Sequence, residues 1–125
     1  MATVQDFLHT DLRTIGTHKT LEEAARVFAG EVLGLLVVVE QDRLVGVLSE
    51  RDVVRSLGEG DDPSQTHVFD VMTEEVVTVD AGSPIGVAVS RMLDSEIRHL
   101  VVTRDDLPHG IVSARDLLRA QLADL

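Results

Sequence analysis

The stretch GVLSERDVVR at residues 46–55 returns as GIVSARDLLR at residues 110–119. Both copies read as a small residue, two apolar residues, a hydroxyl and, three residues further on, a carboxylate. The likeness extends outward, because residues 4–55 align with residues 68–119 without a gap and 13 of these 52 positions are identical. A duplicated unit usually buries its apolar face against its copy, so the two Ser-x-x-Asp corners are expected to face one shared cleft.

Length and composition favour one cooperative globular protein built from two halves, residues 1–62 and residues 63–125. Hydrophobic residues make up 44% of the 125 residues and only three are Pro, so a buried core is available. The absence of Cys excludes disulfides and thiolate chemistry. The sequence shows neither a signal-peptide pattern nor an apolar run of the ~18 residues that a membrane span needs, so a cytoplasmic location is expected.

Charge argues against nucleic acid and membrane surfaces as partners. The net charge is −11, which repels polyanions and anionic lipids. The three aromatic residues are all Phe, so the chain offers few stacking platforms for single strands. A nucleobase, if one binds, is expected to lie against aliphatic side chains.

Each repeat reads as an extended segment, a helix, two strands and a second helix. Thr20 to Glu23 resembles a capping box, and Ser83 followed by Pro84 predicts an N-cap with Pro at the first helical position. The apolar runs 35–39 and 100–102 are typical of strands buried on both faces, and polar turns lead each one into a second strand that ends at the repeated Ser. Residues 57–66 predict the linker, and residues 3–8 and 67–72 predict short lead-in helices.

This order of elements around a duplicated Gly-h-h-Ser-x-x-Asp (h, apolar), with the lead-in VFDVMT at residues 68–73, resembles a pair of cystathionine β-synthase (CBS) domains, a Bateman module. The resemblance implies a mixed α/β (α+β) fold of two βαββα repeats packed as a pseudo-twofold pair. It implies a regulatory module that binds AMP, ADP, ATP or S-adenosylmethionine in the cleft between repeats. A homodimer that signals to a target protein of unknown identity is also implied, with no further cofactor.

The repeated corner has a chemistry that agrees with this resemblance. A strand that ends at Ser49 or Ser113 and runs into a helix presents backbone N–H groups and the positive end of the helix dipole to an anion such as phosphate. Asp52 or Asp116, one turn into the helix, can accept hydrogen bonds from both hydroxyls of a ribose diol. The alternative is a capping box that binds no ligand. Both interpretations hold if the capping box forms in the ligand-free protein and a ligand displaces it on binding.

Basic residues distinguish the two copies. Arg51 and Arg115 lie inside the motifs and are expected to contact phosphate. By resemblance, each pocket combines the motif of one repeat with the loop of the other, so Arg98 and His99 serve the Asp52 pocket, which is then expected to favour phosphorylated ligands. The first copy has Gly34-Leu35 where the second has Arg98-His99. Residues expected near the base or at the pocket edges are Leu33, Gly34, Ile97, Lys19 and Ser83.

Simpler interpretations stay open for several of these residues. Arg51, Arg55, Arg115 and Arg119 could form ordinary surface ion pairs, His99 could be a structural histidine, and Lys19 and Ser83 could be solvent-exposed. The family often has Pro where this chain has Val37 and Val101, so a bulge there is expected to be absent.

An enzyme is not expected. The sequence contains no nucleophile elbow, no phosphate-binding Gly-Lys loop and no dinucleotide fingerprint, and the five His lack metal-ligand spacing. The competing hypothesis is an interaction protein, a CBS dimer with vestigial pockets whose acidic helical faces bind a partner.

Overall fold

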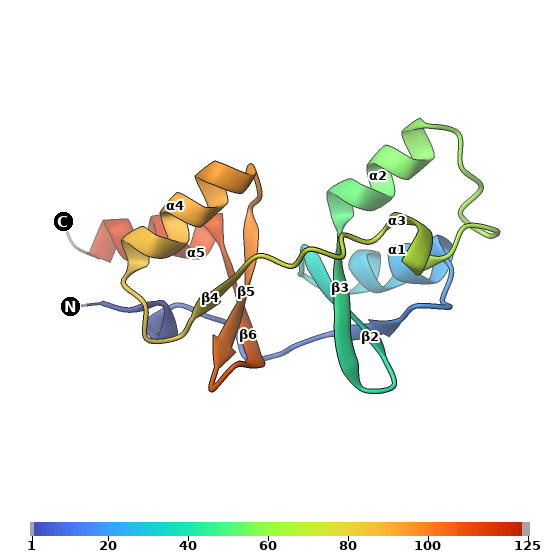
Figure 1. Cartoon of the computed structure of the whole chain (residues 1–125). Helices are drawn as coiled ribbons and strands as arrows, with labels where there is room; N and C mark the ends of the chain where they lie inside the picture. Colours follow the sequence, from blue (N-terminus) through green and yellow to red (C-terminus); the bar gives the residue numbers. More distant parts are fainter. Residues whose placement is uncertain (1, 124–125) are drawn as a thin grey trace. The chain divides into compact units, whose positions relative to one another are not determined.

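Each repeat forms a three-stranded sheet with two helices in the computed structural model, which describes residues 2–123 (Figure 1). The first repeat comprises β1 (Thr14–Gly16), α1 (Leu21–Gly30), β2 (Leu35–Glu40), β3 (Arg43–Ser49) and α2 (Glu50–Gly58). The second comprises β4 (Thr78–Asp80), α4 (Ile85–Ser95), β5 (His99–Arg104), β6 (Leu107–Ser113) and α5 (Ala114–Ala123). The predicted mixed α/β fold with two βαββα repeats is confirmed.

The two sheets have the same topology, with the central strand parallel to one neighbour and antiparallel to the other. β1 pairs in parallel with β2 and β2 in antiparallel with β3, and β4, β5 and β6 repeat this arrangement. The predicted hairpins are confirmed, and both turn residues in each have positive φ, as a type I′ turn requires. Pairing is regular at Val37 and Val101, and the register shifts between Val38 and Val39 and between Val102 and Thr103.

Each sheet carries its own apolar core. Leu36, Val38 and Leu48 pack with Leu21 of α1 and Val53 of α2. Leu100, Val102 and Val112 pack with Ala88 of α4 and Leu117 of α5 in the second repeat. The neighbouring strand residues Val37 and Val101 are also buried, which confirms that β2 and β5 are buried on both faces. No helix among residues 2–123 is long and apolar enough to cross a bilayer.

The starts of α1 and α4 differ from each other. Thr20 caps α1 by accepting a hydrogen bond from the Glu23 N–H at 3.2 Å, as predicted. The prediction for α4 is wrong by one residue, because Pro84 is the N-cap and the helix begins at Ile85. Pro84 has an extended backbone with ψ of 151° and pairs with Thr3, so it cannot be the first helical residue.

The short lead-ins are exchanged between the repeats. They are η1 (Val4–Asp6), a 3-10 turn, and α3 (Val68–Val71). Residues 2–12 pack with residues 77–123, which we call the terminal unit, and Arg13–Val76 form the central unit. In the terminal unit, Val4 N–H donates to Ser83 O at 3.0 Å. The same bond in the central unit joins Val68 N–H to Lys19 O at 2.8 Å. Each unit therefore contains the three strands and two main helices of one repeat together with the lead-in of the other repeat.

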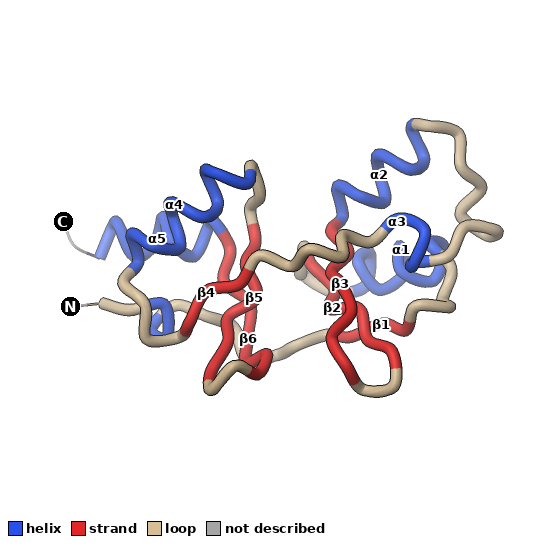
Figure 2. Tube along the Cα trace, in the orientation of Figure 1, coloured by secondary structure: helices blue, strands red, loops and turns tan. Residues whose placement is uncertain are grey.

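The motif glycines lie where each lead-in passes the last strand of a sheet. His9 exchanges two backbone hydrogen bonds with Ile111 of β6, and Thr73 exchanges two with Val47 of β3, so the chain beyond each lead-in runs along the sheet edge (Figure 2). A Cβ on Gly110 would lie 2.5 Å from His9 O, and a Cβ on Gly46 would lie 2.8 Å from Thr73 O. Only glycine fits a backbone approach this close.

Candidate functional site

The Asp52 corner lies in the central unit, where β3 passes into α2. Ser49 and Asp52 form a reciprocal capping box: Asp52 N–H donates to Ser49 Oγ at 3.1 Å, and Ser49 N–H donates to Asp52 Oδ2 at 2.8 Å. Arg55, three residues further along the helix, donates to Asp52 Oδ1 at 2.7 Å. Asp52 is only 7% exposed, so this carboxylate is held in place on both oxygens.

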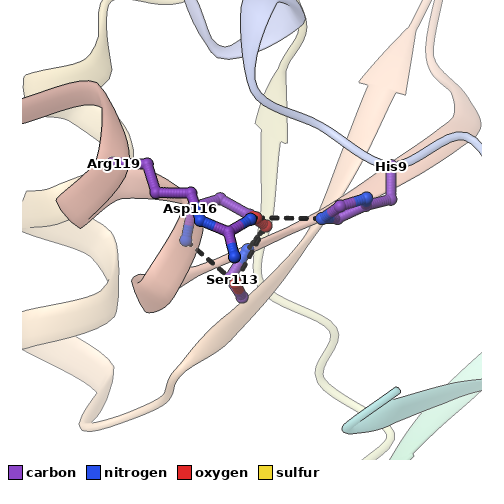
Figure 3. Close-up of polar contacts among 4 residues, drawn as sticks. All are labelled: His9, Ser113, Asp116 and Arg119. Carbon is purple, nitrogen blue, oxygen red and sulfur yellow. Dashed lines mark hydrogen bonds and ion pairs between the residues drawn. The ribbon is translucent and has the colours of Figure 1, made fainter. Parts of the chain in front are cut away.

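The Asp116 corner in the terminal unit has the same capping box with a different partner on Oδ1 (Figure 3). Ser113 donates to Asp116 Oδ2 from both its N–H and its hydroxyl, each at 2.8 Å. His9 Nε2 lies 2.9 Å from Asp116 Oδ1, and Arg119 Nη1 lies farther away at 3.8 Å. Asp116 is 4% exposed, and the imidazole reaches it from the exchanged lead-in.

Electrostatics favours the charged form of Asp116. Burial alone would raise the pKa of this carboxyl group, because a low-dielectric surrounding penalises charge. The hydrogen bonds from the N–H and hydroxyl of Ser113, and the contact with His9, outweigh burial, so the pKa of Asp116 lies below its usual value. The carboxylate is therefore ionised at neutral pH and acts as a hydrogen-bond acceptor.

The loops before β2 and β5 contact the motif of their own repeat. Gly34 O accepts from Glu50 N–H at 3.2 Å, and Arg98 O accepts from Ala114 N–H at 2.8 Å. His99 stands opposite Ser113 in the sheet register. Whether Arg98 and His99 serve Asp52 across the two repeats stays a prediction.

The other predicted site residues have ordinary local surroundings. Leu33 and Ile97, at equivalent positions, are half-buried and pack against the core of their units. Arg51 and Arg115 are exposed, and within residues 2–123 no ion pair engages either one. Lys19 Nζ lies 3.5 Å from Glu23, and Ser83 is half-buried. The roles predicted for these residues at a ligand stay predictions.

Three residues that contact the motif carboxylates are not among the ligand-binding residues that the sequence predicts. Arg55 and Arg119 are identical in the two repeats and sit three residues after the motif Asp, a spacing that places them on the same helix face. The sequence alone predicts ordinary surface ion pairs for both arginines, although this spacing already places each one beside the motif carboxylate. His9 lies 107 residues from Asp116, and nothing in the sequence marks that contact without knowledge of the lead-in exchange.

Comparison with known proteins identifies the family. The CBS domain family model matches residues 4–59 and again residues 68–123. The chain therefore belongs to the CBS domain family and carries a tandem pair of these domains. The CBS domain-containing protein YhcV of Bacillus subtilis is similar, with 32% identity over 125 residues that cover 99% of this chain and 89% of YhcV.

Solved structures agree with the fold. The CBS-domain protein ATU1752 from Agrobacterium tumefaciens matches with a TM-score of 0.89 and 31% identity, over 97% of this chain and 95% of that one. The CBS domain pair of protein MJ0100, solved in complex with 5′-methylthioadenosine and S-adenosyl-L-methionine, matches with a TM-score of 0.90. Its identity is 22%, over 100% of this chain and 99% of that one, so this likeness concerns the fold.

Proposed function

We propose that this CBS pair is a regulatory module that binds an adenosine-containing ligand at its repeated corners and signals to a partner protein. One observation carries the proposal. Asp52 and Asp116 are almost fully buried, yet each has one oxygen whose side-chain partner is largely exposed: Arg55 is 61% exposed and His9 63%. Either partner can turn into solvent without backbone movement, which frees a fixed, oriented acceptor for a ligand.

A ribose diol fits that acceptor. Two adjacent hydroxyls can donate to one carboxylate, and hydrogen bonds to an ionised acceptor are stronger than neutral ones. The other oxygen keeps its bonds to the motif Ser, so the carboxylate stays oriented during the exchange. Asp52 and Asp116 are the proposed ribose-binding residues.

Phosphate is proposed to bind at the start of the helix that follows each Ser. The helix dipole places partial positive charge there, and the exposed guanidinium groups of Arg51 and Arg115 are free to turn toward an anion. The capping box already uses the N–H groups of Ser49, Asp52, Ser113 and Asp116. A phosphate is therefore expected to depend more on the two arginines than on these amides.

The proposal extends to the output of the module. The bound ligand would favour one conformation of the protein, and the size of the shift is limited by its differential affinity for the competing conformations. The crystal structure of MJ0100 with two adenosine compounds supports this choice of ligand class. Exposed apolar side chains on α2, α4 and α5 support a homodimer formed through helices: Val54, Leu57, Leu93, Leu118 and Leu122.

Calorimetric titration tests the binding proposal. AMP, ATP, NAD and S-adenosylmethionine are titrated separately, to millimolar concentration, into the wild-type protein and into Asp52→Ala, Asp116→Ala and Asp94→Ala. Asp94 is an exposed carboxylate of α4 outside both corners, so it serves as the matched control. Binding that weakens in at least one corner variant but not in the control is the expected result. Equal affinity in all four proteins would show that the carboxylates do not bind the ligand.

A second candidate function is an interaction protein with vestigial pockets. The observation in its favour is that both oxygens of each motif carboxylate already have hydrogen-bond partners in the protein, a backbone N–H on Oδ2 and a side chain on Oδ1. Absence of binding heat and of any rise in melting temperature with all four ligands would favour this candidate, because a ligand that binds only the folded state must stabilise it.

A further inference from the structure

The two corners differ in a contact that lies outside both motifs. In the terminal unit, the imidazole of His9 reaches Asp116 Oδ1 from the lead-in, as Figure 3 shows. Thr73 occupies the equivalent place in the central unit, because it exchanges backbone hydrogen bonds with Val47 just as His9 does with Ile111. Oδ1 of Asp52 is instead bonded by Arg55 of its own helix.

The position of Arg119 follows from this difference. Arg55 lies 2.7 Å from Asp52 Oδ1, whereas Arg119, its counterpart, lies 3.8 Å from Asp116 Oδ1. His9 occupies the nearer position at 2.9 Å. Asp52 Oδ1 thus has a partner from its own helix, whereas Asp116 Oδ1 has a partner from a separate segment.

We propose that His9 is a specificity-determining residue that holds Asp116 in the ligand-free protein, so that a ribose diol must displace it and binds more weakly there than at Asp52. The inference rests on the proposed function. It assigns a cause for unequal affinity at the two corners that is independent of Arg98 and His99.

The two partners compete with a diol to different extents. Arg55 can leave Asp52 and still contribute, because its flexible side chain stays on the same helix turn and can turn its charge toward a ligand phosphate. His9 has a short side chain whose backbone is fixed by hydrogen bonds of 2.8 and 2.9 Å to Ile111. Its imidazole therefore returns to Oδ1 whenever the diol leaves.

The chain supplies its own reciprocal substitutions. His9→Thr gives the terminal unit the residue that the central unit has, and Thr73→His does the reverse. Each substitution is combined with a second one that removes the motif carboxylate of the other corner: His9→Thr with Asp52→Asn, and Thr73→His with Asp116→Asn. AMP is the probe, and 2′,3′-dideoxy-AMP, which lacks the diol, is the control ligand.

Isothermal calorimetry measures the effect on affinity. His9→Thr is expected to tighten AMP binding about three- to tenfold, the range for one hydrogen bond to a carboxylate from a largely exposed donor. Thr73→His is expected to weaken AMP binding by a similar factor. Binding of the dideoxy ligand should change less than about twofold in both cases. A purely structural role of His9 would not produce this dependence on the diol.

Two results would overturn the inference while leaving the proposed function intact. One is AMP binding that His9→Thr leaves unchanged in the Asp52→Asn background. The other is an NMR signal of the His9 ring that does not shift when AMP saturates the Asp116 corner. If none of the proteins binds AMP or any other adenosine ligand, the proposed function itself fails, and the competition fails with it.

Discussion

Replacement of Gly110 by Ala should loosen the exchanged lead-in from the terminal unit. The added Cβ would lie 2.5 Å from His9 O and 3.2 Å from His9 C, both backbone atoms that no side-chain rotation can move. The lead-in must therefore shift away from β6. The substitution tests whether packing of the exchanged lead-in contributes to the free energy of unfolding.

The magnitude follows from what the shift disrupts. The shift relieves the overpacked contact by straining or breaking the two backbone hydrogen bonds between His9 and Ile111, each of which contributes about 0.5–1.5 kcal/mol. We expect a loss of about 1–3 kcal/mol in the free energy of unfolding, or roughly 4–12 °C in Tm for a chain of this size. Gly46→Ala should cost less, because its Cβ would lie 2.8 Å from Thr73 O.

Denaturant titration and thermal unfolding measure these losses, with Gly86→Ala as the matched control. Gly86 lies in α4, and a Cβ there meets nothing within 4 Å. Since Ala is the better helix former, this control should gain about 0.5–1 kcal/mol. Hydrogen exchange should also quicken at the amides of His9 and Ile111 in Gly110→Ala. If Gly110→Ala is as stable as wild type, or if it loses less stability than Gly46→Ala, the lead-in does not pack as described.

Three further predictions concern separate features. Burial alone would raise the pKa of Asp116, but hydrogen bonds from Ser113 and His9 hold this pKa below its usual value. The ionised carboxylate therefore stabilises the folded protein above about pH 4, and this stabilisation is lost as the pH falls through the folded-state pKa. The stability difference between wild type and Asp116→Asn, measured by denaturant titration, should therefore shrink on acidification below about pH 4, and a constant difference would contradict this reasoning. Asp106→Gly should stabilise the protein by about 0.5–1 kcal/mol in the same assay, because Asp106 has φ of 63°, and a loss would show that its side chain matters more than its backbone. Leu118, on α5, is 66% exposed, and Leu118→Glu should convert the proposed homodimer to monomer in sedimentation experiments, whereas an unchanged dimer would place the interface elsewhere.

Local signals in the sequence predicted most of the fold. Continuous apolar runs identified β2 and β5, and the polar turns after them identified hairpins, because both patterns depend on neighbouring residues. The start of α4 was misplaced by one residue because Ser-Pro is a good local N-cap signal. Its pairing with Thr3, a residue 81 positions away in the sequence, holds Pro84 in an extended conformation instead.

The sequence predicted the capping box at each corner but not every partner of the two motif carboxylates, and the ligand-binding roles stay predictions. The capping-box alternative described the ligand-free state of both corners correctly, because Ser and Asp three residues apart meet within one helix turn. The capping-box pattern does not predict the partner of the other carboxylate oxygen, Oδ1, in either corner. Arg55 required a specific choice among several nearby carboxylates, and His9 required the lead-in exchange.

The exchange also changes how differences between the repeats should be compared. Aligning the repeats sets residue 9 beside residue 73 and suggests that each belongs with the motif of its own copy. In the folded chain, His9 contacts the Asp of the second motif, so a substitution in the first repeat alters the chemistry of the second. Gly110 and Gly46 preserve the close backbone approach that makes this possible. A duplicated protein built in this way can make its two sites unequal while both motifs stay intact, because the residue that distinguishes them comes from the other copy.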